Sequence, residues 1–417
     1  MHNFTHFLAE SKGGKNLHLE HLEDEILNFG IDGGRAALNF LRSLRNMLAG
    51  TSGSKVNMTV KWDGAPAIFA GIDPSDGKFF VAKKSVFNVN PKLYKSIKDI
   101  DDDNLSGQLN AKFKVAFNEF RNLGIKGVIQ GDLMFTDDVA TTKIDGTSYY
   151  TFQPNTLVYA AAIDSALGKQ IKKSKIGVVW HTTYKGKDLQ DMSASFGVNI
   201  SNLKKTSSVW MDDATYKDVS GTARFTRSET EQITKILSGV GSSFQKIKSS
   251  QLKSFLALQD TSFSKGKIGA GFKSYLNQFI KTGQNFSVEN VKNLNYSMYV
   301  KKYYDEKLIS KLKSQKGRES KEQERDQLVK QLIAYDKLIV TLIEFMQGLV
   351  LAKSIIVTKL NKVKQLTDIF IRTSSGYKVS NPEGYVAIDN SGKGAVKLVD
   401  RLEFSYNNFT AAKNWDK

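Results

Sequence analysis

Residues 60–68, Val-Lys-Trp-Asp-Gly-Ala-Pro-Ala-Ile, carry the strongest local signal in this sequence. Apolar and polar residues alternate from Val56 to Val60, which is the period-two pattern of a half-buried strand. Lys61 continues the polar side of that strand, and Asp63 and Gly64 then allow the backbone to turn tightly beside a ligand. The pattern predicts a lysine at a strand end that faces an open cleft.

Further strands are predicted on both sides of the middle of the chain. Asp-Pro-Ser-Asp-Gly at 73–77 separates Ala67–Ile72 from Lys78–Phe87 and favours an antiparallel hairpin. Other apolar runs predict strands at 127–135, 156–161, 176–184, 369–372, 384–389 and 395–400. Because the last strands need sheet partners that lie before residue 225, we expect one β-rich domain that a helical insertion interrupts.

Helical patterns fill much of the rest. Apolar residues recur at three- and four-residue steps after Asp32, a candidate helix cap, and Gly50 supplies the helix end. From about 228 to 365 the chain is rich in Lys, Leu, Gln and Ser, which is typical of helices. The fold class is therefore predicted to be α+β, with antiparallel sheets. The expected segments are an N-terminal helical segment (1–50), a core in two parts (51–227 and 366–417) and an inserted helical domain (228–365).

The chain is strongly basic. Its 417 residues include 60 Lys and Arg against 42 Asp and Glu, a formal net charge of +18. This excess favours a polyanionic partner, nucleic acid first and an anionic membrane surface second. Lys246–Lys281 interleaves seven lysines with aromatic residues, which suits phosphate contact beside base stacking. The same aromatics at helical spacing also suit a buried core, and both interpretations stay open.

Composition excludes several classes of protein. Hydrophobic residues at 40% and charged residues at 24% exclude a wholly disordered or collagen-like chain. The lack of cysteine excludes disulfides and thiolate chemistry. Met1–Lys15 lacks the apolar core of a signal peptide, and the apolar run Leu338–Ala352 is shorter than the roughly 20 residues of a membrane span. We therefore expect a buried helix at 338–352, no membrane partner and a cytoplasmic location.

The segment Lys61–Gly64 resembles the first motif, Lys-x-Asp-Gly, of the covalent nucleotidyltransferases, which include ATP-dependent RNA and DNA ligases and mRNA capping enzymes. Gln130–Phe135, Pro382–Val386 and Val396–Val399 resemble the third, fourth and fifth motifs in the family's order. The resemblance implies a nucleotidyltransferase (ATP-grasp-like ligase) core with the helical domain inserted between the third and fourth motifs. The chain also resembles uncharacterised proteins of large tailed phages, which implies the host cytoplasm.

The resemblance implies a role for each matching residue. Lys61 is the expected nucleophile toward the α-phosphorus of ATP, with Lys397 and Lys84 stabilising the phosphate charge. Glu383 and Asp132 are the expected Mg²⁺ ligands. The further residues expected to contact the nucleotide are Asp63, Gly64 and Tyr159, the last as a stacking partner of adenine with Trp180 as its competitor.

The implied function is an ATP-dependent polynucleotide ligase of the RNA type, which seals 5′-phosphate and 3′-hydroxyl ends through a lysyl-AMP intermediate. The chain departs from the family at Asp132, where Glu is usual, and at Ala395, where a first Lys is usual. Lys397 then acts alone or with Lys393. Two alternatives remain: a capping-type nucleotidyltransferase, and a catalytically inactive nucleic-acid-binding protein with the same fold.

Histidines add two further candidates. His18 and His21, with Glu20 and Asp24, have helical spacings that suit a metal site, but an acidic helix start explains the same residues and is favoured. His181 is interpreted as a strand histidine with satisfied hydrogen bonds and not as a catalyst.

Overall fold

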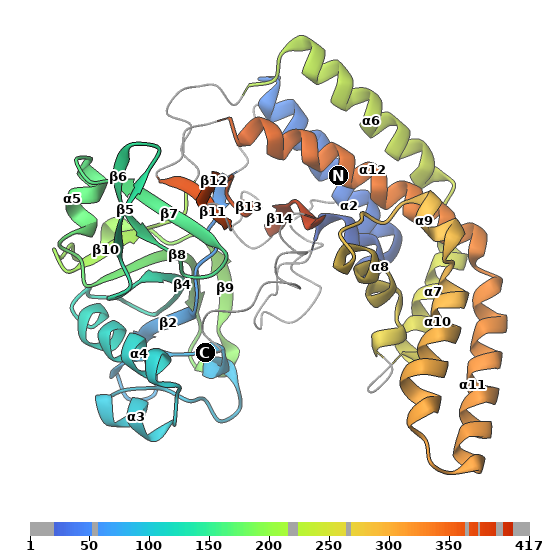
Figure 1. Cartoon of the computed structure of the whole chain (residues 1–417), viewed down its shortest axis with the longest axis horizontal. Coiled ribbons are helices and arrows are strands. Elements are labelled where there is room, and N and C mark those ends of the chain that lie inside the picture. The colour runs from blue at the N-terminus through green and yellow to red at the C-terminus, as the bar shows by residue number, and fades with distance from the viewer. Residues whose placement is uncertain are drawn as a thin grey trace.

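The computed structural model describes residues 21–51, 57–215, 224–263, 268–362, 367–373, 376–388 and 395–402. Over these ranges the protein is a mixed α+β structure with a β-rich lobe and a helical lobe (Figure 1). Lys393 and His18, two of the candidate residues, lie outside the described residues, as does Glu20.

The described strands form three sheets. The first has the order β1-β13-β14, with β1 at Asn57–Lys61, β13 at Gly384–Ile388 and β14 at Ala395–Val399. The second has the order β10-β8-β4-β2-β3 with β9 on β8: β2 Ala67–Ile72, β3 Phe79–Ala82, β4 Val128–Phe135, β8 Ile176–Lys185, β9 Ser193–Phe196 and β10 Val209–Asp212. The third has the order β12-β11-β7-β6-β5: β5 Ala140–Ile144, β6 Thr147–Phe152, β7 Leu157–Ala162, β11 Asp368–Thr373 and β12 Gly376–Val379.

Strand pairing confirms that the late strands find partners early in the chain. β13 pairs antiparallel with β1, and β11 pairs antiparallel with β7. The expected hairpin is the antiparallel pair β2 and β3, although β3 ends at Ala82 and a 3-10 turn, η2 (Lys84–Phe87), follows it. The remaining helices of this lobe are α3 Ile97–Asp102, α4 Gly107–Phe120, α5 Ala166–Ile171, η3 Leu189–Asp191 and η4 Ile200–Asn202.

The helical lobe joins the N-terminal helix to the insertion in a single hydrophobic core. Its elements are η1 Leu22–Asp24, α2 Glu25–Leu48, α6 Arg227–Gln245, α7 Ser249–Ser262, η5 Ile268–Ala270, α8 Phe272–Lys281, α9 Val288–Asn293, α10 Tyr296–Tyr303, η6 Tyr304–Leu308, η7 Ile309–Lys311, α11 Gln315–Ile333 and α12 Asp336–Leu360. Residues 21–48 are therefore part of the same body as the insertion, because Leu41 and Leu44 are buried with Leu237 and Leu342.

The start of α2 differs from the expectation. The helix begins at Glu25 and is kinked at Gly30, where φ is +61°. Phe29 and Gly30 are non-helical, so Asp32 lies in the first turn after the kink, near the predicted helix start, and its carboxylate forms an exposed ion pair with Arg35 at 3.0 Å. The predicted end is confirmed, because Gly50 follows the last turn with φ of +72°.

The aromatic residues of Lys246–Lys281 belong to the core. Phe255 is 0% exposed, and its ring packs edge-on against Phe272 at 5.3 Å between centroids. Phe263, Tyr275 and Phe279 are buried in the same cluster. The interpretation that these rings stack on bases is wrong, because helical spacing turns them into the lobe rather than toward solvent.

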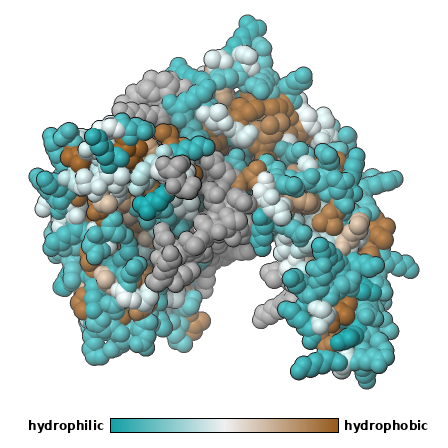
Figure 2. Space-filling model, in the orientation of Figure 1, coloured by the Kyte–Doolittle hydropathy of each residue, from teal (hydrophilic) through white to brown (hydrophobic). Residues whose placement is uncertain are grey.

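The apolar helix α12 extends the predicted helix in both directions. It is long and apolar enough to cross a membrane by composition alone, but half of its most apolar window is buried against the rest of the protein. Leu342 and Met346 are 0% exposed in the core of the lobe. On the face seen in Figure 2, hydrophilic residues cover most of both lobes, and the largest hydrophobic area lies over the upper part of the helical lobe.

Candidate functional site

A pocket of about 400 Å³ opens where the first sheet faces the second. Strands β1, β13 and β14 supply one wall, and β2, β4, β8 and β9 supply the other. The charged and titratable side chains that line it are Lys61, Lys84, Asp132, His181, Glu383 and Lys397. Five of these six are residues that the motif order singled out, so the fold brings together groups from both ends of the chain.

Lys61 and Glu383 form an ion pair at the base of the pocket. The antiparallel register places Lys61 opposite Gly384, so the side chain of the preceding Glu383 reaches the lysine Nζ. Burial alone would lower the pKa of Lys61, but the Glu383 carboxylate outweighs burial and raises it above its ordinary value of 10.5. At neutral pH the lysine is therefore an ammonium group held by a carboxylate that is only 4% exposed.

Lys397 approaches the same pocket from β14, where it pairs with Val386 of β13. Burial and the charge of Lys61 lower the pKa of Lys397 to about 8. Lys397 therefore carries most of a positive charge at pH 7, and it would lose that charge readily in mild alkali.

Asp132 and His181 meet on the opposite wall. The register places Asp132 of β4 beside Ala67 of β2, and Asp132 Oδ2 lies 3.6 Å from His181 Nε2. A register shift between β4 and β8 lies at Gln130 and Gly131, opposite the histidine. His181 lies in β8 with Nδ1 2.8 Å from Thr182 Oγ1, as expected for a hydrogen-bonded strand histidine, and it also lines the pocket. This register shift lets His181 line the pocket beside Thr182, which strict alternation along β8 would not predict.

Asp63 has a structural position beside the pocket. Its carboxylate accepts hydrogen bonds from Asn155 Nδ2 at 2.7 Å and from the main-chain N–H groups of Thr156 and Leu157 at 2.7 and 3.0 Å. These three donors tie the loop after β1 to the start of β7. The expected nucleotide contact of Asp63 is corrected accordingly: its carboxylate is 6% exposed and engaged in positioning the loop.

Gly64 is needed for the close approach of this loop to β4. A Cβ atom at residue 64 would lie 2.5 Å from Asp132 Cβ and 3.0 Å from Leu133 O, both closer than van der Waals contact. The main-chain N–H of Ala65 donates to Leu133 O at 2.9 Å, which fixes the loop against the strand. Gly64 thereby allows Asp132 and Lys61 to share one pocket.

The two aromatic candidates for base stacking lie elsewhere. Tyr159 is 1% exposed, its hydroxyl accepts a hydrogen bond from the Asp63 N–H at 2.7 Å, and its ring packs against Trp62. Trp180 is 0% exposed and packs against Phe120 of α4. Neither ring lines the pocket. Tyr159 does not reach the pocket as expected, because both faces of β7 are buried inside the lobe.

The pocket is also lined by residues that the sequence analysis did not predict. Tyr184 and Phe196 line the pocket with Gln130 and Thr182. The Tyr184 hydroxyl donates to Gln130 Oε1 at 2.7 Å, which fixes the orientation of that amide. Period-two alternation along β8 contained the signal for Thr182 and Tyr184, but no motif pointed to either.

Neighbouring lysines after β3 have different environments. Lys84 lines the pocket and is exposed, whereas Lys83 forms an ion pair with Asp103 at 2.8 Å. Asp103 is also held by Lys92 and by the Tyr94 hydroxyl. Lys83 is therefore held in an ion pair within the lobe, and Lys84 is the lysine of the two that lines the pocket.

The N-terminal acidic segment fits its structural interpretation. Glu23 and Asp24 are buried against cationic side chains of the helical lobe. Across the described ranges, no group of three or more His, Asp or Glu side chains is placed to hold a metal ion by itself.

The fold and pocket together define a two-lobed α+β protein whose conspicuous site pairs a lysine with a carboxylate. The chain belongs to the family of unknown function DUF6267, which it matches over residues 16–413. No curated protein and no solved structure matches the chain.

Proposed function

We propose that this protein is an ATP-dependent polynucleotide ligase of the RNA type that acts through a lysyl-AMP intermediate on Lys61. The observation that carries the proposal is the convergence of Lys61, Glu383 and Lys397 in one pocket. The proposal assigns the three sheets to a nucleotidyltransferase core, with the helical domain inserted between β10 and β11. It rests on the motif resemblance together with this convergence.

In the first step Lys61 gives one ammonium proton to solvent water, and the neutral Nζ attacks the α-phosphorus of ATP. A P–N bond forms, the bond from the α-phosphorus to the bridging oxygen breaks, and pyrophosphate leaves. Lys397 and Lys84 face the same space and would stabilise the charge that develops on the phosphate oxygens. Since the pKa of Lys61 is raised by Glu383, separation of this pair is part of the activation.

The residues present fit a magnesium ion. Asp132 and Glu383 supply hard carboxylate oxygens in the pocket, and Mg²⁺ in such sites is held by one or two carboxylates together with substrate phosphates. When bound, the ion offsets phosphate charge and holds the triphosphate in line. The ion and the ammonium group of Lys61 would compete for the Glu383 carboxylate.

The later steps use a nucleic acid as the second substrate. A 5′-phosphate oxygen attacks the phosphorus of lysyl-AMP and releases Lys61, and a 3′-hydroxyl then displaces AMP to form the phosphodiester. The net charge of +18 favours a nucleic-acid partner. The proposal includes a cytoplasmic location, in the host cell if a phage encodes the protein.

The test is covalent labelling of the full chain with α-³²P ATP and Mg²⁺. We expect label that survives denaturation, is released as AMP by acid and is lost in Lys61→Ala. Lys83→Ala is the matched control, because Lys83 lies outside the pocket in an ion pair with Asp103. Label from GTP in place of ATP would favour the capping-type enzyme. Absence of label with both nucleotides would contradict the proposal and favour an inactive binding protein.

A further inference from the structure

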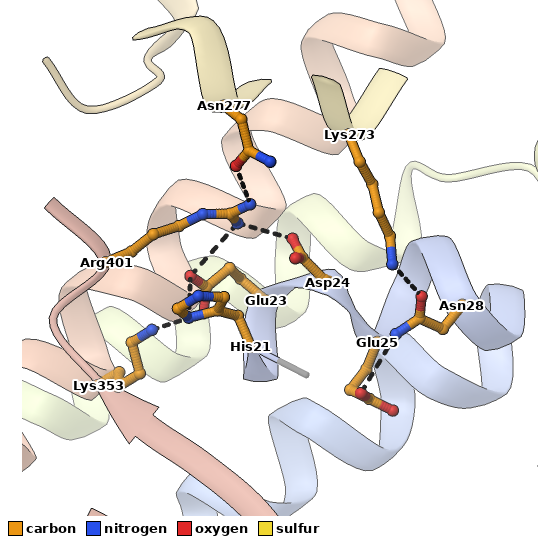
Figure 3. Close-up of polar contacts among 9 residues, drawn as sticks. All are labelled: His21, Glu23, Asp24, Glu25, Asn28, Lys273, Asn277, Lys353 and Arg401. Atoms are coloured by element: carbon orange, nitrogen blue, oxygen red, sulfur yellow. Dashed lines mark hydrogen bonds and ion pairs between the residues drawn. The ribbon is translucent and has the colours of Figure 1, made fainter. Parts of the chain in front are cut away.

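A buried ionic cluster joins the N-terminal segment to α12 and to the residues after β14 (Figure 3). Glu23 is 0% exposed and accepts a hydrogen bond at 2.6 Å from Lys353 Nζ, which is itself buried. Arg401 Nη1 lies 2.8 Å from Asp24 Oδ1 and 3.7 Å from Glu23 Oε1. Arg401 Nη2 donates to Asn277 Oδ1 at 2.8 Å, so α8 is tied to the same group.

The cluster is charged and not merely polar. Burial raises the pKa of Glu23, but the nearby Lys353 and Arg401 cations outweigh burial and lower it to about 2. Burial lowers the pKa of His21 well below its ordinary value, so this histidine is neutral at pH 7. Buried ion pairs of this kind seldom add stability compared with apolar side chains of similar volume. Stability alone therefore gives no reason for the cluster.

The same segment contacts the outer edge of β14, the strand that carries Lys397. β14 is the outer strand of the β1-β13-β14 sheet, and its inner neighbour places Val386 opposite Lys397. On the other edge, His21 forms an isolated parallel bridge with Lys397. The main chain at Lys397 is thus held from both sides, and Arg401 anchors the chain four residues further on.

We propose that His21, Glu23 and Asp24, locked by Lys353 and Arg401, form a clamp that positions Lys397 in the pocket. The clamp makes the placement of a pocket lysine depend on the helical lobe, which supplies Lys353 from α12 and Asn277 from α8. These residues are positioning residues, since they act through the backbone of β14. The catalytic part of the inference rests on the proposed ligase function, whereas the structural part does not.

The test replaces the charges without emptying the core. In the full chain, Glu23→Leu combined with Lys353→Met removes the ion pair and keeps its volume, so the variant is expected to fold with near wild-type stability. Backbone amides of residues 395–399 should then exchange at least tenfold faster with solvent, while amides of α6 keep their protection. The saturating rate of label transfer from ATP should fall about tenfold or more, with little change in the half-saturating ATP concentration.

The control is Glu229→Gln, which alters another ion pair of α12, that of Glu229 with Lys359, without touching β14. It should leave exchange at residues 395–399 unchanged. Wild-type exchange at 395–399 in the double variant would overturn the clamp, as would an equal loss of protection in α6. If the wild-type chain takes no label, the proposed function fails. Hydrogen exchange and modification of Lys397 by an amine reagent would still decide whether the clamp exists.

Discussion

Lys61 lies in the pocket as an ammonium group that already has a partner. Its Nζ contacts Glu383, and this carboxylate is almost fully enclosed. A lysine in this state is a poor nucleophile, because its nitrogen lone pair is bonded to a proton and the neighbouring carboxylate stabilises that protonated form. Under the proposed function, Lys61 must therefore lose both this proton and its contact with Glu383 before it can attack.

The adjacent residues Lys84 and Lys83 allow a matched test of the phosphate-binding role proposed for Lys84. Lys84→Ala should lower the rate of label transfer to Lys61 by on the order of tenfold to a hundredfold, because it removes a cation from the phosphate side of the pocket. Lys83→Ala should leave this rate within about twofold, because Lys83 pairs with Asp103. The measurement is single-turnover labelling of the two purified variants. Equal losses in both would argue against a phosphate-binding role for Lys84.

At the scale of single elements, α6 and α12 are joined through one carboxylate. Glu229 accepts a hydrogen bond from the Thr226 N–H at 2.7 Å in the capping box of α6, and it pairs with the buried Lys359 of α12 at 2.9 Å. The hydrogen bonds from Lys359 and from the Thr226 main chain lower the pKa of Glu229 to about 2.

The pH dependence of this contact follows from the depressed pKa. The Glu229 charge stabilises the folded protein fully above its ordinary pKa of 4.5, and that contribution is lost as the pH falls toward 2. Glu229→Gln keeps a cap acceptor but removes the charge, so it should cost about 1–3 kcal/mol at pH 7. Denaturant unfolding at pH 7 and pH 2.5 measures the difference. A difference that stays constant between these pH values would contradict the assignment.

Periodicity predicts strands and helices where one face is buried. β1, β2, β4, β8 and β14 follow apolar alternation or apolar runs and are confirmed within one or two residues. β5 is missed because it is an edge strand whose residues are mostly exposed, so its sequence lacks the alternating apolar residues of a half-buried strand. α4 is missed although Phe113, Phe117 and Phe120 have helical spacing. The kink at Gly30 hides the first turns of α2, since it shifts the phase of the pattern.

The candidate site could be predicted only in part. Local patterns place Lys61 at a strand end, but nothing local links it to Glu383, 322 residues away, and only the order of motifs suggested that they meet. The stacking aromatic could not be assigned, because alternation shows that Tyr159 faces one side of β7 and leaves open whether that side lines a pocket or a core. For the same reason, the sequence could not show that the strand histidine His181 lines the pocket.

At the scale of the whole molecule, the basic excess predicts how the proposed nucleic-acid partner would bind. The aromatic rings of Lys246–Lys281 are buried, so base stacking from this region cannot supply affinity, and phosphate contacts must. Binding of single-stranded RNA should therefore weaken steeply with salt, with log K falling by about 0.7 per phosphate contact for each unit of log salt concentration. Titration at several KCl concentrations measures the slope, and affinity independent of salt would contradict the prediction.

The sheet that joins β1 to β13 and β14 has a consequence for biosynthesis. A ribosome makes Lys61 long before it makes the strands that flank it, because β13 begins at Gly384. A nascent chain that has only reached the insertion can pair β2, β4 and β8, but β1 still lacks its neighbour. The pocket gains its second wall only when translation has passed residue 399. Partly made chains would therefore hold Lys61 without Glu383 and Lys397, the groups that share its pocket.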